Sequence, residues 1–460
     1  MTDAAAPETR ALPADLCLLP LATGELLVSR SHATYCPVPP DHLPAARALV
    51  AGGLGLDGLP AALVASLDRH GFLGPPRPAE DDRATVQLQL TNACNLACSY
   101  CCTHSGQARA AELTEAEAAG VIDRARELLG PAGRVALLGG EPLLVPWATT
   151  VAARALDHGL DLTLFTNGMP LADPDLARRV ADLAQRGAEV RISLAGPTAE
   201  LCDGLSGEPR FEAVMTGLAN LHDAGGRAKI DLMLIPQHVA AVAEHLPALR
   251  RRLPPGTPVA LGVLYRSGRE EGEHLFASAA ELEDALDRIA FAAGEWIAAP
   301  ERQPVAYRRE GCACAVGDHL NVRSDGGLFT CFKMEEPVGH LRREGFEATL
   351  ADVRAHPHPA ASLRRCADCP LATLCGGGCR SENYLYTGDP DEPACGPWRI
   401  RVICELLAED RVTALDWPVH YLVREAEGRG IPVDERPVPR RASTNLLEGG
   451  IRPSMPSDQK

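Results

Sequence analysis

The sequence predicts an α/β protein built around a partial (β/α)6 TIM barrel, and three observations lead to this fold class. Six short apolar strands alternate with helical patterns between residues 85 and 265, which is typical of a parallel sheet. A small unit of three strands and two helices precedes them, and a cysteine-rich region with little periodicity follows. We therefore expect an N-terminal winged-helix-like α+β domain, the barrel, and a C-terminal Cys-rich domain.

Composition excludes several classes of protein. The 460 residues carry 45 basic and 61 acidic side chains, a net charge of −16, which argues against nucleic acid as a partner. No apolar run approaches the roughly 20 residues that cross a membrane, and Met1–Arg10 lacks the features of a signal peptide. We expect a cytoplasmic protein. Because disulfides are rare in that reducing compartment, its 16 cysteines indicate metal binding.

The N-terminal unit is predicted from short runs separated by turn residues. Three strands are followed by two helices and a proline-rich linker at 74–82. The five elements are expected at Leu16–Leu21, Glu25–Ser29, Thr34–Val38, Leu43–Ala51 and Leu59–His70.

The barrel strands follow in order. A helix at Leu113–Leu129 separates the first two, and its Thr114 and Glu117 are spaced as a capping box. Six βα units rather than eight leave the barrel incomplete, with reactive groups expected at the C-terminal ends of the strands. The strands are expected at Val86–Leu90, Val135–Leu138, Leu162–Phe165, Val190–Leu194, Lys229–Ile235 and Val259–Leu264.

After a helix at Ala279–Ala298 the periodicity breaks down. The region that follows is rich in Cys and Gly, so we expect metal rather than a large core to hold its fold. The prolines from Pro432 onward indicate a flexible tail. The resulting domains are an N-terminal unit, the barrel core, a helical bridge, the Cys-rich domain, and a C-terminal helix with its tail: 1–78, 79–270, 271–308, 309–405 and 406–460.

Three cysteines directly follow the first barrel strand: Cys94, Cys98 and Cys101. Three thiolates in one short loop suit an iron–sulfur cubane, and they leave one iron open to a ligand. Zinc is the alternative, but it would require a fourth ligand nearby. Cys102 is adjacent to Cys101 and would point elsewhere, whereas His104 could serve.

This triplet, with Tyr100 before its third cysteine, resembles the radical S-adenosylmethionine (SAM) enzymes over about residues 85–265. A glycine-rich segment, Gly139-Gly140-Glu141-Pro142, follows the second strand, where the family has one. The resemblance implies that this segment binds the methionine end of SAM, with Glu141 accepting hydrogen bonds from its ammonium. It also implies that Ser193 contacts the cofactor and that Tyr100 lies against the adenine.

The resemblance implies a mechanism as well. In that family the cluster donates one electron to SAM, which breaks into methionine and a 5′-deoxyadenosyl radical. The radical removes a hydrogen atom from an unreactive C–H bond, while the protein positions the target and excludes water. An electron donor such as flavodoxin or ferredoxin is therefore implied.

The later cysteines resemble the SPASM extension, which carries two auxiliary [4Fe–4S] clusters in radical enzymes that act on peptides. Cys366-x2-Cys369-x5-Cys375-x3-Cys379, followed by Cys395, keeps the family's order. The resemblance implies one cluster on Cys366, Cys369, Cys375 and Cys395, and another on Cys331, Cys379 and Cys314. Cys312 could complete the latter; otherwise one of its irons is open to substrate. Zinc knuckles are the alternative for this region.

Two departures from the motifs of related enzymes narrow the kinds of peptide modification that fit this chain. Sulfatase maturases have an acidic residue directly after the second auxiliary-motif cysteine, where this chain has Phe332 and then Lys333. Ala195 replaces the acid of the family's usual SLDGP segment. The arginine expected in the next loop falls near Leu205, which leaves Arg210 as the candidate replacement.

Maturases of ribosomally made peptides (RiPPs) remain as the favoured type. The N-terminal unit is similar in pattern to a leader-peptide recognition element, which binds the leader of a precursor peptide as an added strand; an ordinary cap on the barrel is the alternative. We expect the enzyme to install a cyclophane-type C–C or thioether crosslink. A peptide epimerase, using Cys202 or Cys404 as hydrogen donor, and a decarboxylating maturase are alternatives, and a zinc-binding non-catalytic protein is the alternative outside the class.

Several points stay open at the level of sequence. The modified residue, the bond type and the oligomeric state cannot be read from it. The catalytic base is also open, with Tyr265 and Arg266 among the candidates at the barrel mouth.

Overall fold

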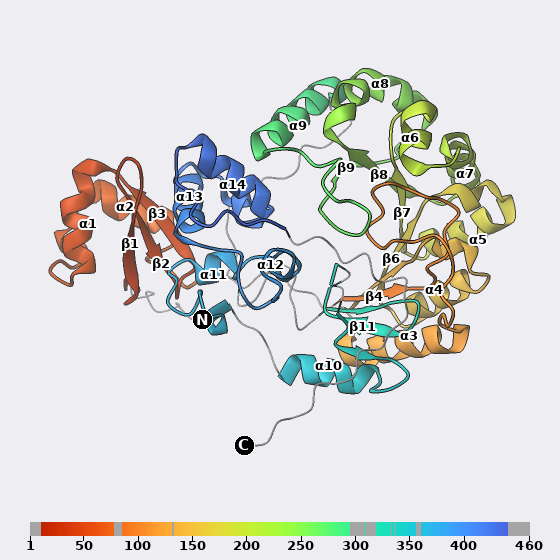
Figure 1. Cartoon of the computed structure of the whole chain (residues 1–460), viewed down its shortest axis with the longest axis horizontal. Coiled ribbons are helices and arrows are strands. Elements are labelled where there is room, and N and C mark those ends of the chain that lie inside the picture. The colour runs from red at the N-terminus through yellow and green to blue at the C-terminus, as the bar shows by residue number, and fades with distance from the viewer. Residues whose placement is uncertain are drawn as a thin grey trace, which may run out of the picture.

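A nine-stranded sheet forms the centre of the larger part of the molecule (Figure 1). The computed structural model describes residues 11–77, 85–130, 133–294, 309, 319–331, 333–334, 336–355 and 360–439. Six strands lie side by side in chain order and all are parallel, as predicted. They are β4 (Thr85–Gln89), β5 (Arg134–Leu138), β6 (Asp161–Thr166), β7 (Glu189–Leu194), β8 (Ala228–Leu234) and β9 (Val259–Val263).

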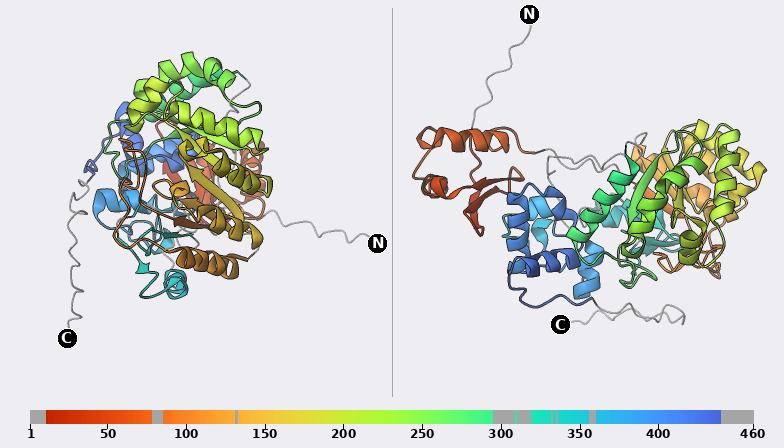
Figure 2. Two further views of the ribbon diagram at one scale, coloured as in Figure 1. Left: turned by 90° about the vertical axis from the view of Figure 1, so that its right-hand side faces the viewer. Right: turned by 90° about the horizontal axis from the view of Figure 1, so that it is seen from above.

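Helices connect these strands and cover the outer face of the sheet (Figures 1 and 2). The apolar residues of β4–β9 and of these helices form one large core, as expected for βα units. The predicted capping box is present, because Thr114 accepts from the Glu117 N–H and Glu117 accepts from the Thr114 N–H. The helices are α3 (Glu115–Leu129), α4 (Ala148–Asp157), α5 (Pro174–Gln185), α6 (Ala199–Ser206), α7 (Phe211–Asp223), α8 (Val239–Arg252) and α9 (Ala279–Ala293).

The sheet extends beyond the six predicted strands. β10 (His319–Val322) pairs in parallel with β4, and the antiparallel strands β11 (Gly327–Phe329) and β12 (Gly339–His340) follow it. These strands have four, three and two residues, too few to show an alternating pattern in sequence. The Cys-rich region therefore contributes an edge to the sheet.

The N-terminal unit has the predicted elements. Its antiparallel sheet has the order β1-β2-β3, and the two helices pack on one face. The strand bounds agree with the prediction to within one residue. The elements are β1 (Leu16–Pro20), β2 (Glu25–Ser29), β3 (Thr34–Val38), α1 (Leu43–Val50) and α2 (Ala61–Arg69).

The other face of this small sheet packs on the C-terminal helices, which lie between it and the barrel (Figures 1 and 2). Leu26 and Val28 of β2 join Val402 and Leu406 in one buried cluster. The expectation that metal rather than a core holds residues 309–405 is therefore wrong for this part, because α13 buries most of its apolar side chains. These helices are α11 (Ala372–Cys375), α12 (Arg380–Thr387), α13 (Pro397–Ala408) and α14 (Val419–Gly428), whereas α10 (Phe346–Ala355) packs beside α3 and β12.

Some predictions fall outside the described residues. These are residues 78–82 of the linker, residues 295–308 of the helical bridge, and the tail from residue 440 onward. No helix in the described ranges is both long and apolar enough to cross a membrane.

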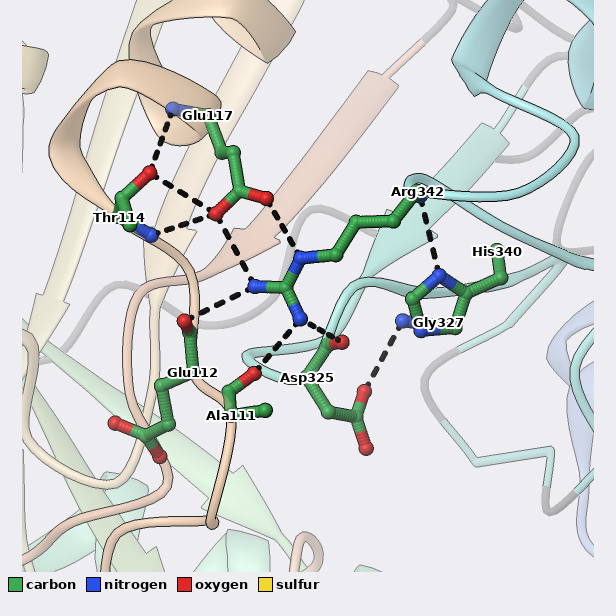
Figure 3. A network of polar contacts seen from close by, with 8 residues as sticks. All are labelled: Ala111, Glu112, Thr114, Glu117, Asp325, Gly327, His340 and Arg342. Atoms are coloured by element: carbon green, nitrogen blue, oxygen red, sulfur yellow. Dashed lines mark hydrogen bonds and ion pairs between the residues drawn. The ribbon is translucent and has the colours of Figure 1, made fainter.

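Arg342, in the loop after β12, connects the Cys-rich region to the barrel (Figure 3). Its guanidinium donates to both carboxylate oxygens of Glu117 (2.6 and 3.1 Å) and to the carbonyls of Ala111 and Glu112 (3.0 Å each). The Glu112 carboxylate in turn accepts from the Asn92 N–H (2.6 Å), just before the cysteine loop. One arginine thus ties β12, the start of α3 and the end of β4 together.

This network gives a pH-dependent prediction. Hydrogen bonds from Arg342 and from Thr114 lower the pKa of Glu117 from 4.5 to about 2. A depressed pKa stabilises the fold fully above the unfolded value and less as pH falls towards the folded value. We expect Glu117→Gln to lower the unfolding free energy by about 1 kcal/mol at neutral pH.

The difference between wild type and Glu117→Gln should shrink as pH falls from 4.5 towards 2, measured by urea unfolding across that range. Glu115→Gln is the matched control, because Glu115 is an exposed acid in the same helical turn. A difference of equal size at every pH would contradict this interpretation.

Candidate active site

The loops at the C-terminal ends of the barrel strands converge on one cavity of about 440 Å³. Its lining includes Leu138 after β5, Asn167 after β6, Met233 of β8 and Tyr265 after β9. Most of the predicted site residues of the barrel line it together: Cys94, Cys98, Tyr100, Cys101, Gly139, Gly140 and Ser193. The parallel sheet thus assembles in space what the sequence suggested from two separate motifs.

The cysteine loop is held by the segment that follows β9. The Arg269 side chain donates to the carbonyls of Cys98 (2.7 Å) and Ser105 (2.8 Å), and its N–H donates to the Cys101 carbonyl (2.9 Å). Gly268 lies so close that a Cβ there would be 2.3 Å from the Cys101 oxygen. The last strand of the barrel therefore braces the loop after the first.

The three thiols have different acidities. Burial raises the pKa of Cys94 to about 11 and also raises that of Cys98, which Arg210 partly opposes. Burial also acts on Cys101, but hydrogen bonds from Thr103 and from the Ser105 N–H outweigh it and lower its pKa. Because metals bind thiolates, Cys101 is the thiol best prepared for ligation.

Gly139 and Gly140 pack closely against the backbone of the cysteine loop. A Cβ on Gly140 would lie 2.1 Å from the Ala93 oxygen, and one on Gly139 would lie 2.8 Å from the Thr91 oxygen. The N–H of Gly140 also donates to the Thr91 carbonyl (2.7 Å). The glycines therefore allow close approach of the β5 loop to the cysteine-loop backbone.

Glu141 lies behind the cavity rather than in its lining. Its side chain is fully buried and accepts from Thr166 Oγ1 (2.7 Å) and from the N–H groups of Asn167 (2.6 Å) and Leu143 (3.0 Å). Burial raises its pKa to about 7. We expected this carboxylate to accept from the ammonium of the ligand; in the structure it fastens the β6 loop to the β5 loop.

The structure adds residues that the sequence left open or missed. Arg210 lines the cavity at 2 % exposure, donates to the Ser193 carbonyl and has no hydrogen-bond partner for its Nε. Asn167 also lines it and donates to Asn95 Oδ1 (2.7 Å). The position directly after β6 was the only signal for Asn167, whereas Arg210 was already the candidate for the arginine expected in the loop after β7. Cys102, which we expected to point elsewhere, is another lining residue.

A second cavity collects four of the later cysteines: Cys366, Cys369, Cys375 and Cys395. Cys331 and Cys379 are described but do not line it, and Cys312 and Cys314 lie outside the described residues. In the described ranges, no three His, Cys, Asp or Glu side chains are grouped as a site for a single metal ion.

The Cys-rich region also reaches the first cavity. Lys333, two residues after Cys331, lines the cavity, and its Nζ lies 4.0 Å from the ring centroid of Tyr265. The mouth of the barrel is thus formed by both domains.

Comparison with known proteins identifies the barrel. Residues 88–246 match the family model described as the Radical SAM superfamily. These residues form a radical SAM domain. The matched range contains the cysteine triplet, Gly139, Gly140 and Ser193, all of which line the cavity.

Curated relatives extend the similarity. The chain is 28 % identical over 344 residues to mycofactocin maturase MftC of Mycobacterium tuberculosis (strain CDC 1551 / Oshkosh), covering 67 % of this chain and 81 % of that protein. It is 26 % identical over 336 residues to PqqA peptide cyclase of Streptomyces rochei, covering 69 % and 91 %.

Solved structures agree on the fold. The AdoMet-bound structure of anSMEcpe has a TM-score of 0.51 at 15 % identity, covering 75 % of this chain and 99 % of that one. Streptococcus suis SuiB bound to precursor peptide SuiA has a TM-score of 0.50 at 13 % identity, covering 86 % and 100 %. At these identities the likeness concerns the fold alone.

The residues of the first cavity fit the cofactors of a radical SAM enzyme, SAM and a [4Fe–4S] cluster. Three thiols face the cavity from one loop, and the buried Arg210 has an orphaned nitrogen beside it. Cys94, Cys98 and Cys101 would hold the cluster, and Arg210 would face the carboxylate of SAM. A guanidinium suits that carboxylate because its fork of donors matches two oxygens.

The close approach at Gly140 yields a prediction. We expect Gly140→Ala to displace the cysteine loop. The added methyl carbon would lie 2.1 Å from the carbonyl oxygen of Ala93, and this oxygen can move away only if the loop moves with it. Anaerobically reconstituted protein should lose iron and SAM cleavage while its circular dichroism is retained.

Gly120→Ala, in α3, is the control, since nothing lies within 4 Å of a Cβ built there. It should keep both iron and cleavage. Full iron content in Gly140→Ala would show that the two loops do not depend on this contact.

Proposed function

We propose that this chain is a maturase that installs a crosslink, of cyclophane-type C–C or thioether kind, in a ribosomally made precursor peptide. The observation that carries the proposal is the extent of the similarity to two peptide-modifying relatives. Each alignment covers about two thirds of the chain, well beyond the 88–246 range of the radical SAM model. The similarity to these two relatives thus extends beyond the radical SAM domain.

The chain's own residues suggest how a peptide would be handled. The cavity has a mouth formed by Tyr265 from the barrel and Lys333 from the Cys-rich region, so a peptide side chain would enter between the two domains. Bound SAM and its cluster supply the radical that removes a hydrogen atom from that side chain. The apolar part of the lining, including Leu96, Phe165 and Met233, would exclude water from the reacting carbon.

The four-cysteine cavity supports an auxiliary cluster that takes up the remaining electron. When a carbon radical forms a new bond to a thiol or an aromatic ring, one electron and one proton must leave. We assign the electron to the site of Cys366, Cys369, Cys375 and Cys395, and the proton to solvent. A second auxiliary cluster on Cys331 and Cys379, with Cys314 and Cys312, belongs to the same proposal.

We infer that the leader of the precursor docks on the N-terminal sheet at the outer edge of β1. Both faces of this sheet are covered, one by α1 and α2 and the other by α13 and α14. At the other edge, the Arg77 N–H donates to the His32 carbonyl just before β3 and the Thr34 hydroxyl donates to the His70 carbonyl, so residues 70–77 lie at the start of the β3 edge. β1, in contrast, is half-buried along its length.

The hydrogen-bond register gives this edge a definite pattern. The Leu21 N–H donates to the Gly24 carbonyl (3.1 Å), so the N–H groups of Cys17 and Leu19 face β2 in the alternation of an antiparallel pair. Those of Leu16 and Leu18 therefore face outward, and Pro20 has none. A peptide strand added there would meet two donors.

The two cysteines considered as hydrogen donors of an epimerase lie away from the cavity. Cys202 is fully buried and Cys404 is 1 % exposed, and neither lines the cavity. Among the described cysteines outside the triplet, Cys102 does line it, which makes Cys102 the candidate hydrogen donor of an epimerase. No observation favours decarboxylation.

Co-expression with a candidate precursor peptide, taken from a short open reading frame if one neighbours the coding sequence, tests the proposal. Mass spectrometry should show that the peptide loses two hydrogen atoms per crosslink. Epimerisation would leave the mass unchanged in ordinary water and add one deuterium in heavy water, and decarboxylation would remove carbon dioxide. Replacement of Cys94, Cys98 and Cys101 by alanine should abolish 5′-deoxyadenosine formation.

Metal content tests the non-catalytic zinc alternative. Three four-iron sites predict about twelve irons per chain in anaerobically purified protein, with matching labile sulfide. Zinc without sulfide would end the enzyme interpretation.

The edge of β1 gives a further prediction. Leu18→Pro removes an outward N–H without removing a bond to β2, and proline is tolerated at such edge positions. We expect it to weaken binding of a fluorescent leader peptide at least tenfold by anisotropy. Leu18→Ala, which keeps the N–H, is the control. Equal affinity in the two variants would place the leader elsewhere.

A further inference from the structure

Arg399 is a buried cation beside the four-cysteine cavity. It lies in the first turn of α13, is 3 % exposed, and lines the cavity with Cys366, Cys369, Cys375 and Cys395. Arginine stays protonated even when buried, so it carries a full positive charge there.

The hydrogen bonds of Arg399 compensate little of this charge, and the buried Glu382, which interacts with it electrostatically, forms no ion pair with it in the described residues. Its Nη1 donates to the Ala394 carbonyl (3.0 Å), whereas its Nε has no hydrogen-bond partner. The neighbouring Arg380 lies 3.7 Å from the carboxylate of Asp391, but in the described part of the chain no ion pair includes Arg399. Burying a cation without an anionic partner costs several kcal/mol.

The anion that the cavity offers is the set of four thiolates. Cys395 lies on the turn before α13, and Cys366, Cys369 and Cys375 approach from the preceding segment around α11. An iron–sulfur cluster held by four thiolates is anionic, and reduction by one electron makes it more so. Net charge and hydrogen bonds near the sulfurs set the reduction potential of such clusters.

We propose that Arg399 is the buried counter-charge of the cluster on Cys366, Cys369, Cys375 and Cys395, and that it raises the reduction potential of this cluster. The inference rests on the auxiliary cluster of the proposed function. In the reaction, the oxidised cluster takes the one electron released at ring closure while the proton leaves to solvent. The positive charge favours the reduced cluster and so favours this transfer.

Other arginines near the cluster are less suited to this role. Arg365 lines the same cavity, but its side chain is 47 % exposed and is paired with Glu392 (2.7 Å). Solvent and the carboxylate screen its charge. Arg401, two residues after Arg399 on the same helix, is exposed and does not line the cavity.

An anaerobic redox titration of the reconstituted full chain, monitored by electron paramagnetic resonance, tests the inference. We expect Arg399→Gln to shift one cluster midpoint to a more negative potential and to leave the others unchanged. Arg399→Lys should recover most of the shift, because it keeps the charge. Arg401→Gln, which removes the same formal charge from an exposed site, should shift none of them.

The affected midpoint is assigned with Cys395→Ala, which should abolish the same signal. An unchanged midpoint in Arg399→Gln at full iron content overturns the inference. If Arg399→Gln loses four irons, recovery of the iron content in Arg399→Lys supports a requirement for positive charge at this position. Loss of iron in both variants indicates that Arg399 is needed only for packing, and this result overturns the inference.

A separate result would contradict the auxiliary cluster itself. If replacing all four cysteines by alanine leaves the iron content of the chain unchanged, the site holds no cluster. That outcome removes the electron acceptor of the proposed function, whereas an unchanged midpoint in Arg399→Gln leaves that function intact.

Discussion

The structure depends on the convergence of strand ends around one cysteine loop. The loop after β4 has its backbone against the β5 loop, where Gly140 leaves no room for a side chain, and it is fastened from the far end of the sheet by Arg269. Three thiols on a short loop can share one cluster only if that loop is held rigidly. The parallel sheet provides this rigidity because all its strands end at the same edge.

Buried arginines accompany both groups of cysteines. Arg210 lines the first cavity and Arg399 the second, each almost fully buried and each with an unpartnered Nε. Their charges are costly in isolation and become favourable beside an anionic ligand. The chain has a net charge of −16. Arg210 and Arg399 place positive charge at the two cavities where we propose that electrons are transferred, and so offset the negative charge there.

The small N-terminal sheet packs on the C-terminal helices as well as on its own helices α1 and α2. Its two faces are covered by α1 and α2 and by α13 and α14, so only its edges can meet a peptide. The helix that carries Arg399 is therefore packed directly on the sheet proposed to bind the leader. Arg342 makes the second connection, between the Cys-rich region and the entrance to the cysteine loop.

The sequence by itself determined the parallel strand order, the capping box and the residues of the first cavity, because period and motif spacing are local properties. It missed β10–β12, which are too short to show a period, and it did not show the contacts of Gly139, Gly140 and Glu141 with neighbouring loops. Tertiary structure alone decided that these residues brace loops, that Arg210 and Lys333 reach the cavity, and that α13 has a core. Such contacts join segments far apart in the chain, and a local sequence pattern does not predict which distant segment a residue will contact.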